Sequence, residues 1–155
     1  MTDSSLDEID LRILRVLQSD GRITNQDLAE RCHLSAAACH ERFKRLRDRG
    51  YIQGFAALLD PRKLDRALLI FVEILLDRTT SDIFDTFAKA VRRCPEVLDC
   101  FMVAGGFDYL IKVRVQDMTA YRALLGSTLV NLPGVRETRT YSVLEEIKTT
   151  VQLPI

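Results

Sequence analysis

Cysteine and histidine gather in one short stretch of the chain, in the order Cys32, His33, Cys39 and His40. Thiolate and imidazole groups are the ligands that zinc prefers in tetrahedral protein sites. The C-H-x5-C-H spacing matches no common zinc module, and both cysteines fall where helix packing would bury them. We therefore expect neither a metal site nor another cofactor.

Nucleophilic catalysis has even less support in the sequence. His33 and His40 are the two histidines of the whole chain, and the carboxylates are scattered over helix faces that we expect to be solvated. A catalytic nucleophile needs a base within hydrogen-bond reach, and no such pairing is suggested. No glycine-rich loop for a phosphate is evident. The sequence predicts a protein that is not an enzyme.

A predicted helix over residues 36–48 carries the strongest chemical signal. Three alanines open it, and five basic residues fall between positions 42 and 49. Cys39, Phe43 and Leu46 recur at i, i+4 and i+7, so this stripe must face other helices. The remaining positions then lie outward or on the flanks. A small, smooth helix end with cations beside it suits the major groove of DNA, which is about 12 Å wide.

The residues expected to contact DNA are Thr24, Ser35, Ala37, Ala38, His40, Glu41, Arg42, Lys44 and Arg45. We expect phosphate contacts from Ser35, Arg42, Lys44 and Arg45. Base reading would fall to Ala37, Ala38, His40, Glu41 and Arg42. The competing interpretation is an ordinary solvated basic face, and charge alone does not decide between the two.

The elements before this helix strengthen the DNA interpretation. A helix over about 6–18 has apolar residues at three- and four-residue spacing and ends at Asp20-Gly21. A second helix over about 25–32 follows, with Thr24 as N-cap and Asp27 as a weak capping-box partner. Ser35 is the expected N-cap of the third helix, and Gly50 follows its end. Two helices joined by a tight turn, the second of them cationic, form a helix-turn-helix.

The second part of the chain alternates strand and helix patterns. Strands are expected over 66–77, twice within 96–115 around Gly105-Gly106, and over 136–148; helices over 82–94 and 117–132. The order is βαββαβ, the ferredoxin-like arrangement, so the fold class is α+β with an N-terminal, winged-helix-like domain. Glu73 interrupts an apolar strand and is expected to pair with Lys112 or Arg114 across the sheet.

Domain boundaries follow the change of pattern. We expect a helix-turn-helix domain over 1–50, a linker strand or wing over 51–65, and a ferredoxin-like domain over 66–155. The first strand is apolar on both faces, so one face needs cover beyond its own helices. A second subunit is the simplest cover, which predicts a homodimer.

Composition limits the class of protein. The chain has 155 residues, 47% of them hydrophobic, with 22 acidic and 22 basic side chains. Any affinity for nucleic acid must therefore come from local charge. The acidic first residues do not resemble a secretion signal, and the longest apolar run is far too short to span a membrane. We expect a cytoplasmic protein with reduced thiols and no membrane partner.

Taken together, these segments resemble the Lrp/AsnC (feast/famine) transcriptional regulators, closest to the leucine-responsive branch. The resemblance covers about residues 6–150. Its marks are LDEIDLRILRVLQSDGRITNQDLAERCHLS, CHERFKRLRDRGYIQGFAALLDP, VAGGFDYLIKVRVQDMTAYRALLG and LPGVRETRTYSVLEEIK. It implies double-stranded DNA as partner, control of genes of amino-acid or nitrogen metabolism, and dimers that assemble further, commonly to octamers.

The resemblance also implies a small-molecule effector, often an amino acid, bound near the glycine turn. The corresponding residues are Met102, Gly105, Gly106, Phe107, Asp108, Met118, Val130, Tyr141 and Ser142. From the residues alone, Gly105-Gly106 suits a type I′ hairpin turn that Asp108 caps. A second functional hypothesis is an amino-acid-binding regulatory subunit that acts on a protein partner. Two departures from the family are Ala36–Ala38 where prolines are common, and His33 where glycine is usual.

Overall fold

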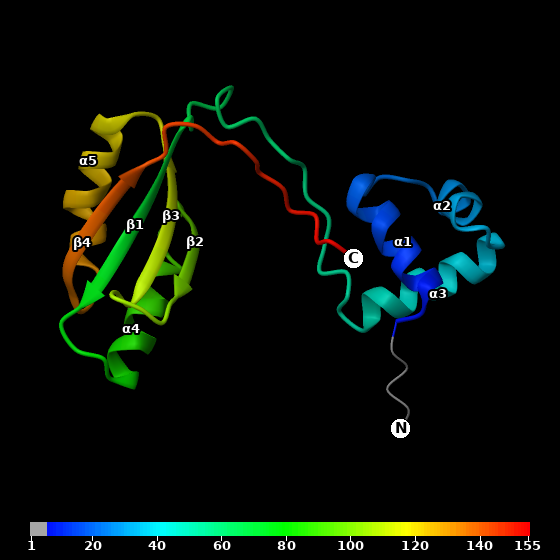
Figure 1. The fold of residues 1–155 in the computed structure, drawn as a ribbon, viewed down its shortest axis with the longest axis horizontal. Coiled ribbons are helices and arrows are strands. Elements are labelled where there is room, and N and C mark those ends of the chain that lie inside the picture. Colours follow the sequence, from blue (N-terminus) through cyan, green and yellow to red (C-terminus); the bar gives the residue numbers. More distant parts are fainter. Residues whose placement is uncertain (1–5) are drawn as a thin grey trace. The chain divides into compact units, whose positions relative to one another are not determined.

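A computed structural model describes residues 6–155; residues 1–5, which were predicted to belong to the first domain, lie outside the described part. The chain divides into two compact units (Figure 1). One contains the residues up to Leu58 together with Lys148–Ile155, and the other is Leu59–Ile147. No helix of the described residues is long and apolar enough to cross a membrane.

The first unit is a bundle of three helices. They are α1 (Glu8–Ser19), α2 (Asn25–Cys32) and α3 (Ala36–Asp48). The predicted caps are confirmed: the Thr24 hydroxyl accepts the Asp27 N–H, and the Ser35 hydroxyl accepts the Ala38 N–H. Gly50 follows α3 with φ +77° and lets the Gly50 and Tyr51 N–H groups bond back to the helix. Local chemistry therefore sets the bounds of these helices.

One apolar core holds the three helices together. Its buried members are Ile13, Leu28, Ala29, Cys32, Cys39 and Leu46. The C-terminal tail adds polar contacts on α1, because the Gln18 side chain donates to the Leu153 carbonyl and accepts from the Leu153 N–H. The tail thus belongs to the first unit, although it was predicted to belong to the second domain.

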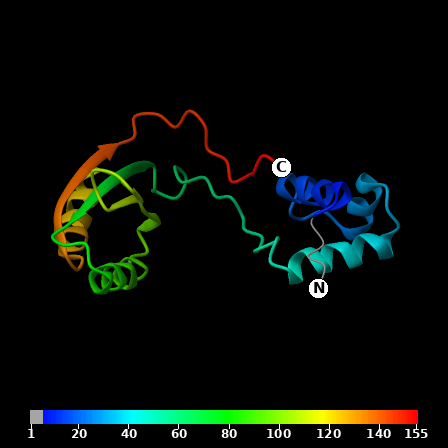
Figure 2. The ribbon, with the colours of Figure 1, turned by 60° about the horizontal axis from the view of Figure 1, so that its bottom comes forward.

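The second unit is a four-stranded antiparallel sheet with the expected βαββαβ order. Its elements are β1 (Leu68–Leu76), α4 (Ser81–Val91), β2 (Val97–Met102), β3 (Tyr109–Val115), α5 (Met118–Ser127), the 3-10 helix η1 (Leu129–Asn131) and β4 (Val135–Ser142). The strand order β2-β3-β1-β4 puts the first and third strands in the centre. Both helices lie on one face of the sheet (Figure 2).

Alternation along the central strands builds the core of this unit. Ile70, Val72 and Ile74 of β1 are buried, as are Tyr109, Ile111, Val113 and Val115 of β3. The Phe87 ring of α4 stacks on Tyr109 with centroids 4.4 Å apart. The opposite face carries Phe71, Glu73 and Leu75, which are only partly buried. One face of the sheet is therefore covered by this chain, and the other is not.

Two local expectations are wrong. Residues 51–65 form no strand or wing, because they have no strand beside them in the single chain. Glu73 pairs with Arg139 of β4 at 4.0 Å, since the register places it opposite Arg139 and Leu110. Lys112 and Arg114 instead pair with Asp99 and Glu146.

The last helix and strand are shorter than predicted. The helix expected over 117–132 ends at Ser127 and is followed by a 3-10 turn. The Asn131 side-chain amide donates hydrogen bonds to the carbonyls of Gly126 and Ser127 at this end. The final strand ends at Ser142, where its pairing with β1 ends.

Candidate nucleic-acid interface and effector region

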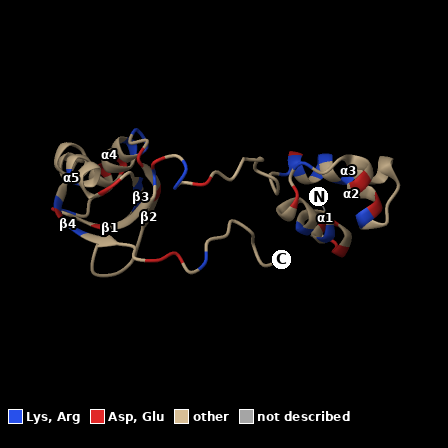
Figure 3. Cartoon of the chain, turned by 90° about the horizontal axis from the view of Figure 1, so that it is seen from above, with Lys and Arg blue, Asp and Glu red and all other residues tan. Residues whose placement is uncertain are grey.

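The outward side of α3 is a small, exposed surface at the start of the helix. Ala37, Ala38, His40, Glu41 and Lys44 are exposed. Behind them Cys39 and Leu46 are buried and Phe43 is partly buried, as the i, i+4, i+7 stripe predicts. Lysine and arginine recur along the second half of the helix (Figure 3). This helix can therefore enter a groove without disturbing the core of the unit.

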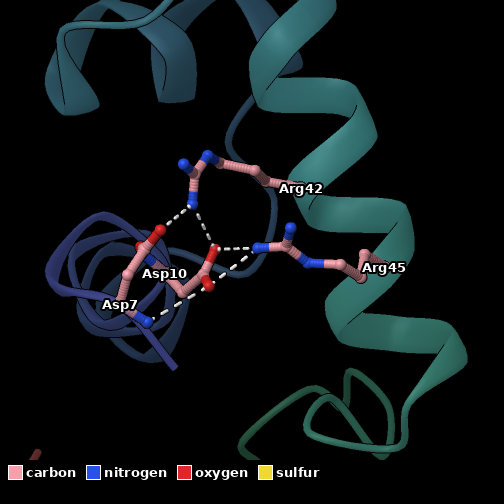
Figure 4. Close-up of polar contacts among 4 residues, drawn as sticks. All are labelled: Asp7, Asp10, Arg42 and Arg45. Carbon is pink, nitrogen blue, oxygen red and sulfur yellow. Dashed lines mark hydrogen bonds and ion pairs between the residues drawn. The ribbon is translucent and has the colours of Figure 1, made fainter. Parts of the chain in front are cut away.

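Two predicted DNA contacts, Arg42 and Arg45, turn toward α1 (Figure 4). Arg42 Nη1 lies 2.6 Å from Asp7 Oδ2 and 2.8 Å from Asp10 Oδ1. Arg45 Nη2 lies 2.8 Å from both carboxylate oxygens of Asp10. The hydrogen bond from Arg42 lowers the pKa of Asp7, and the hydrogen bond to Asp7 raises the pKa of Arg42. Both guanidinium groups are therefore held by carboxylates, on the flank of the outward surface.

The turn before α3 is fixed by two features. His33 adopts the left-handed conformation, with φ 57° and ψ 46°, and caps the end of α2. The Asn25 side chain donates to the Ala36 carbonyl at 2.9 Å and so ties the start of α2 to the start of α3. These contacts set the angle between the two helices of the motif.

Sequence reasoning missed Asp7, Asp10 and Asn25. A signal for Asp10 exists, because it follows Leu6 by four residues and precedes Ile13 by three, on the apolar stripe of α1. A carboxylate in that phase must be buried and needs partners. Asn25 carries no comparable signal, since its partner is a backbone carbonyl eleven residues away.

The four-residue cysteine and histidine cluster does not converge. Cys32 and Cys39 are buried in the helical core, while His33 and His40 are exposed. Burial raises the pKa of both thiols, which disfavours the thiolate that a metal needs. Among residues 6–155 no group of three or more histidine, cysteine, aspartate or glutamate side chains could hold a metal ion.

The predicted effector residues lie at two ends of the sheet. Met102, the loop 103–108 and Val130 are near the end where β1 reaches Ile74 and Leu76. Tyr141 and Ser142 pair with Phe71 and Ile70 toward the other end, and Met118 follows β3 there. Ile70 and Ile74 are four residues apart along β1, which is about 13 Å of strand. One chain therefore does not bring these residues into one pocket.

The glycine loop is wider than a hairpin turn. Six residues connect β2 to β3, and neither Gly105 nor Gly106 has the positive φ that a type I′ turn requires. The Val103 N–H closes the loop on the Asp108 carbonyl at 3.0 Å. The Asp108 carboxylate accepts the Leu76 N–H at 2.8 Å, so one of its oxygens anchors the loop to β1. Gly105 and Gly106 are exposed, with open space around their Cα atoms.

Comparison with known proteins agrees with both units. Residues 6–53 match the family described as winged helix-turn-helix DNA-binding, and residues 69–153 match the Lrp/AsnC ligand binding domain. Relatives named leucine-responsive regulatory protein, from Klebsiella pneumoniae and Escherichia coli, are 53% identical over 150 residues. The alignment covers 97% of this chain and 92% of theirs. The chain belongs to the Lrp/AsnC family of transcriptional regulators.

Solved structures of Lrp/AsnC regulators have the same fold. A transcriptional regulator from Neisseria meningitidis, solved as a complex with L-Met, is 41% identical, with a TM-score of 0.92 over 97% of each chain. An AsnC family regulator from Agrobacterium tumefaciens is 32% identical, with a TM-score of 0.92 over 96% of this chain and 97% of that one. This Lrp/AsnC regulator thus combines a DNA-binding helix-turn-helix unit with a ligand-binding unit of the family type.

Proposed function

We propose that this regulator reads DNA with the outward side of α3. Ala37 and Ala38 would let the helix backbone approach the base pairs, because their side chains are small and exposed. His40 and Glu41 would reach base edges, and Ser35 and Lys44 would contact phosphates on either side. The exposed start of α3, with its core stripe buried behind it, is the observation that carries this proposal.

Thr24 is expected to contact the DNA backbone from the start of α2. Its hydroxyl already accepts the Asp27 N–H and contacts the Asp27 carboxylate at 2.7 Å. We therefore assign Thr24 a secondary role, in which the exposed N-terminus of α2 faces a phosphate. Because the proposed ligand is genomic DNA, we place the protein in the cytoplasm.

We infer that the ligand-binding unit responds to an amino acid. The Neisseria meningitidis relative was solved with L-Met, and the same family domain spans most of this unit. Gly105 and Gly106 would leave backbone N–H groups open to a ligand carboxylate. Met102 and Met118 would supply an adaptable apolar wall. Since the proposed residues lie at two ends of one sheet, we propose that more than one chain completes the pocket.

The dimer expected from the sequence has two sources of support. The sheet face with Phe71 and Leu75 has no helix of its own chain over it. Phe55, Leu58 and Leu59 are exposed in a segment whose backbone has no partner strand. A second copy would cover both apolar sets, and dimers would then place two α3 helices in successive major grooves. Assembly beyond the dimer, to an octamer, follows only from the family resemblance.

Selection of genomic fragments by the pure protein tests the proposed function. We expect enrichment of sites with two half-sites about one helical turn apart, or multiples of it. Repeating the selection with each amino acid should change the affinity or the spacing for one of them. Control of amino-acid or nitrogen genes predicts that the enriched fragments lie beside such genes. Recovery of random fragments under all conditions would contradict the proposal.

A further inference from the structure

A buried carboxylate lies directly behind the proposed DNA-reading helix. Asp10 has 3% of its surface exposed and is the one buried charged residue of residues 6–155. It occupies the third position of α1 and closes a capping box with Asp7. A buried carboxylate is costly unless hydrogen bonds and opposite charges compensate it. Its partners therefore determine what this position does.

Both of its charged partners come from α3. Arg42 bridges Asp7 and Asp10 with one nitrogen, and Arg45 Nη2 contacts both oxygens of Asp10 (Figure 4). Two carboxylates thus face two guanidinium groups, and the four charges sum to zero. A phosphate that approached either arginine would therefore meet a guanidinium whose charge is already balanced by a carboxylate.

The other cations of α3 are placed differently. Lys44 is exposed and has no acidic partner among the described residues. Arg47 is exposed, 3.5 Å from Asp48, with its guanidinium over the Phe43 ring. Lys44 is therefore available to a phosphate, whereas Arg42 and Arg45 are paired with Asp7 and Asp10. DNA would therefore contact fewer unpaired positive charges on α3 than the number of its lysine and arginine residues indicates.

We propose that Asp7 and Asp10 are positioning residues that set DNA specificity. They hold Arg42 and Arg45 against α1, fix the rotation of α3, and withhold two cations from sequence-independent contact with phosphates. This inference rests on the proposed function of α3. Nonspecific binding depends on the number of phosphates neutralised, so withholding cations lowers it and widens the ratio of specific to nonspecific affinity.

The substitutions Asp7→Asn and Asp10→Asn test the proposal in the full-length protein. Asparagine keeps the N-cap at position 7. Glu8→Gln is a matched control, because it removes the same charge from the neighbouring residue and releases Arg15 of α1 rather than an α3 arginine. Binding to a random-sequence duplex would be followed by fluorescence anisotropy across a KCl series, with circular dichroism to verify folding.

Relative to Glu8→Gln, we expect Asp7→Asn and Asp10→Asn each to steepen the plot of log affinity against log salt by up to about 0.9, because each removes one of the two balancing carboxylates. Nonspecific affinity should rise at low salt, and the ratio of operator to random-duplex affinity should fall. Should Asp10→Asn fail to fold, Asp7→Asn decides, since Asp7 is half-exposed.

A slope for folded Asp7→Asn that equals the Glu8→Gln slope, or is shallower, would overturn the inference. A shallower slope would mean that the carboxylates orient the arginines toward phosphates instead. Wild-type protein that binds no duplex in a salt-dependent way would contradict the proposed function itself. The two failures are therefore distinguishable.

Discussion

At the scale of single residues, His33 stands at a position where most side chains would be strained. Its φ of 57° lies in the left-handed region, which histidine tolerates better than most residues. The turn of the helix-turn-helix depends on this conformation, because the His33 N–H bonds back to α2 there. This conformation was expected only from the resemblance, in which glycine is usual at the position of His33.

Substitutions at position 33 should follow backbone strain. We expect His33→Val to lower the free energy of unfolding by about 1–2 kcal/mol, because a β-branched side chain is disfavoured in the left-handed region. His33→Gly should be close to neutral, since relief of strain is offset by about 0.5–1 kcal/mol of backbone entropy. Urea unfolding measures both, with His33→Ala as the intermediate case. Equal stability of the valine and glycine variants would exclude strain at this turn.

The acid stability of the first unit should depend on Asp7. Its pKa is lowered in the folded protein by the Arg42 hydrogen bond, from an ordinary value of 3.8. The contribution of Asp7 to stability is therefore fully present above about pH 5 and is lost as pH falls through the folded pKa. Thermal unfolding between about pH 2 and pH 6 should give a gap between wild type and Asp7→Asn that closes at the acid end. If the difference in thermal stability between the two proteins grew as the pH fell, the pKa of Asp7 would be raised by folding instead of lowered.

The caps were predictable residue by residue, whereas the ion cluster was not. Thr24, Ser35 and Gly50 act within one turn of their own helices, so local sequence is enough to identify them. Asp10 and Arg42 are 32 residues apart, and their contact depends on how α1 and α3 pack. The positive charges of Arg42 and Arg45 can be read from the sequence. The direction of their side chains cannot, because it depends on the packing of α1 against α3.

At the scale of elements, α2, α3 and the βαββαβ order along the chain were predicted from sequence patterns, while the details of strand pairing were not. Alternation of apolar and charged residues identifies β3, whereas β1 is identified by a long apolar run that Glu73 interrupts. The register that puts Glu73 beside Arg139 depends on which strand flanks β1 at that position. The six-residue loop at 103–108 differs from the tight turn that Gly105-Gly106 suggests, because Asp108 extends the closure toward β1.

A cavity in the core of one unit should destabilise that unit and leave the stability of the other unit unchanged. Ile13→Ala removes a fully buried side chain of the helical unit and should cost about 2–5 kcal/mol. Phe87→Ala removes the ring that stacks on Tyr109 and should cost about 3–5 kcal/mol in the sheet unit. Hydrogen exchange read by mass spectrometry would locate each loss. Faster exchange in both units after either substitution would show that the cores are coupled.

At the scale of the whole molecule, two apolar surfaces of the described residues have no cover from their own chain. The segment before β1 has exposed apolar side chains and no strand partner, and one face of the sheet has no helix over it. A single sequence predicts that such faces need cover, but it does not supply the geometry of a second chain. For the same reason the effector residues were predicted as a set only by resemblance, and one chain leaves them apart.

Assembly should be measurable directly. We expect sedimentation equilibrium at micromolar protein to give a dimer or a larger species. Phe71→Lys should weaken the association, because it would put a charge on the uncovered face of the sheet. Leu153→Lys, on the exposed tail of the first unit, is the matched control. A wild-type protein that is monomeric at this concentration would exclude the dimer.

If the outward side of α3 enters a DNA groove, the substitution Ala38→Glu should weaken binding to a selected operator. Ala38 is exposed, so glutamate should leave the fold intact while placing a negative charge against the duplex. We predict a loss of at least about tenfold, or 1.4 kcal/mol, at fixed salt. Ala123→Glu makes the same change on an exposed position of α5 and should bind like wild type. Equal operator affinity for the two folded variants would contradict the account.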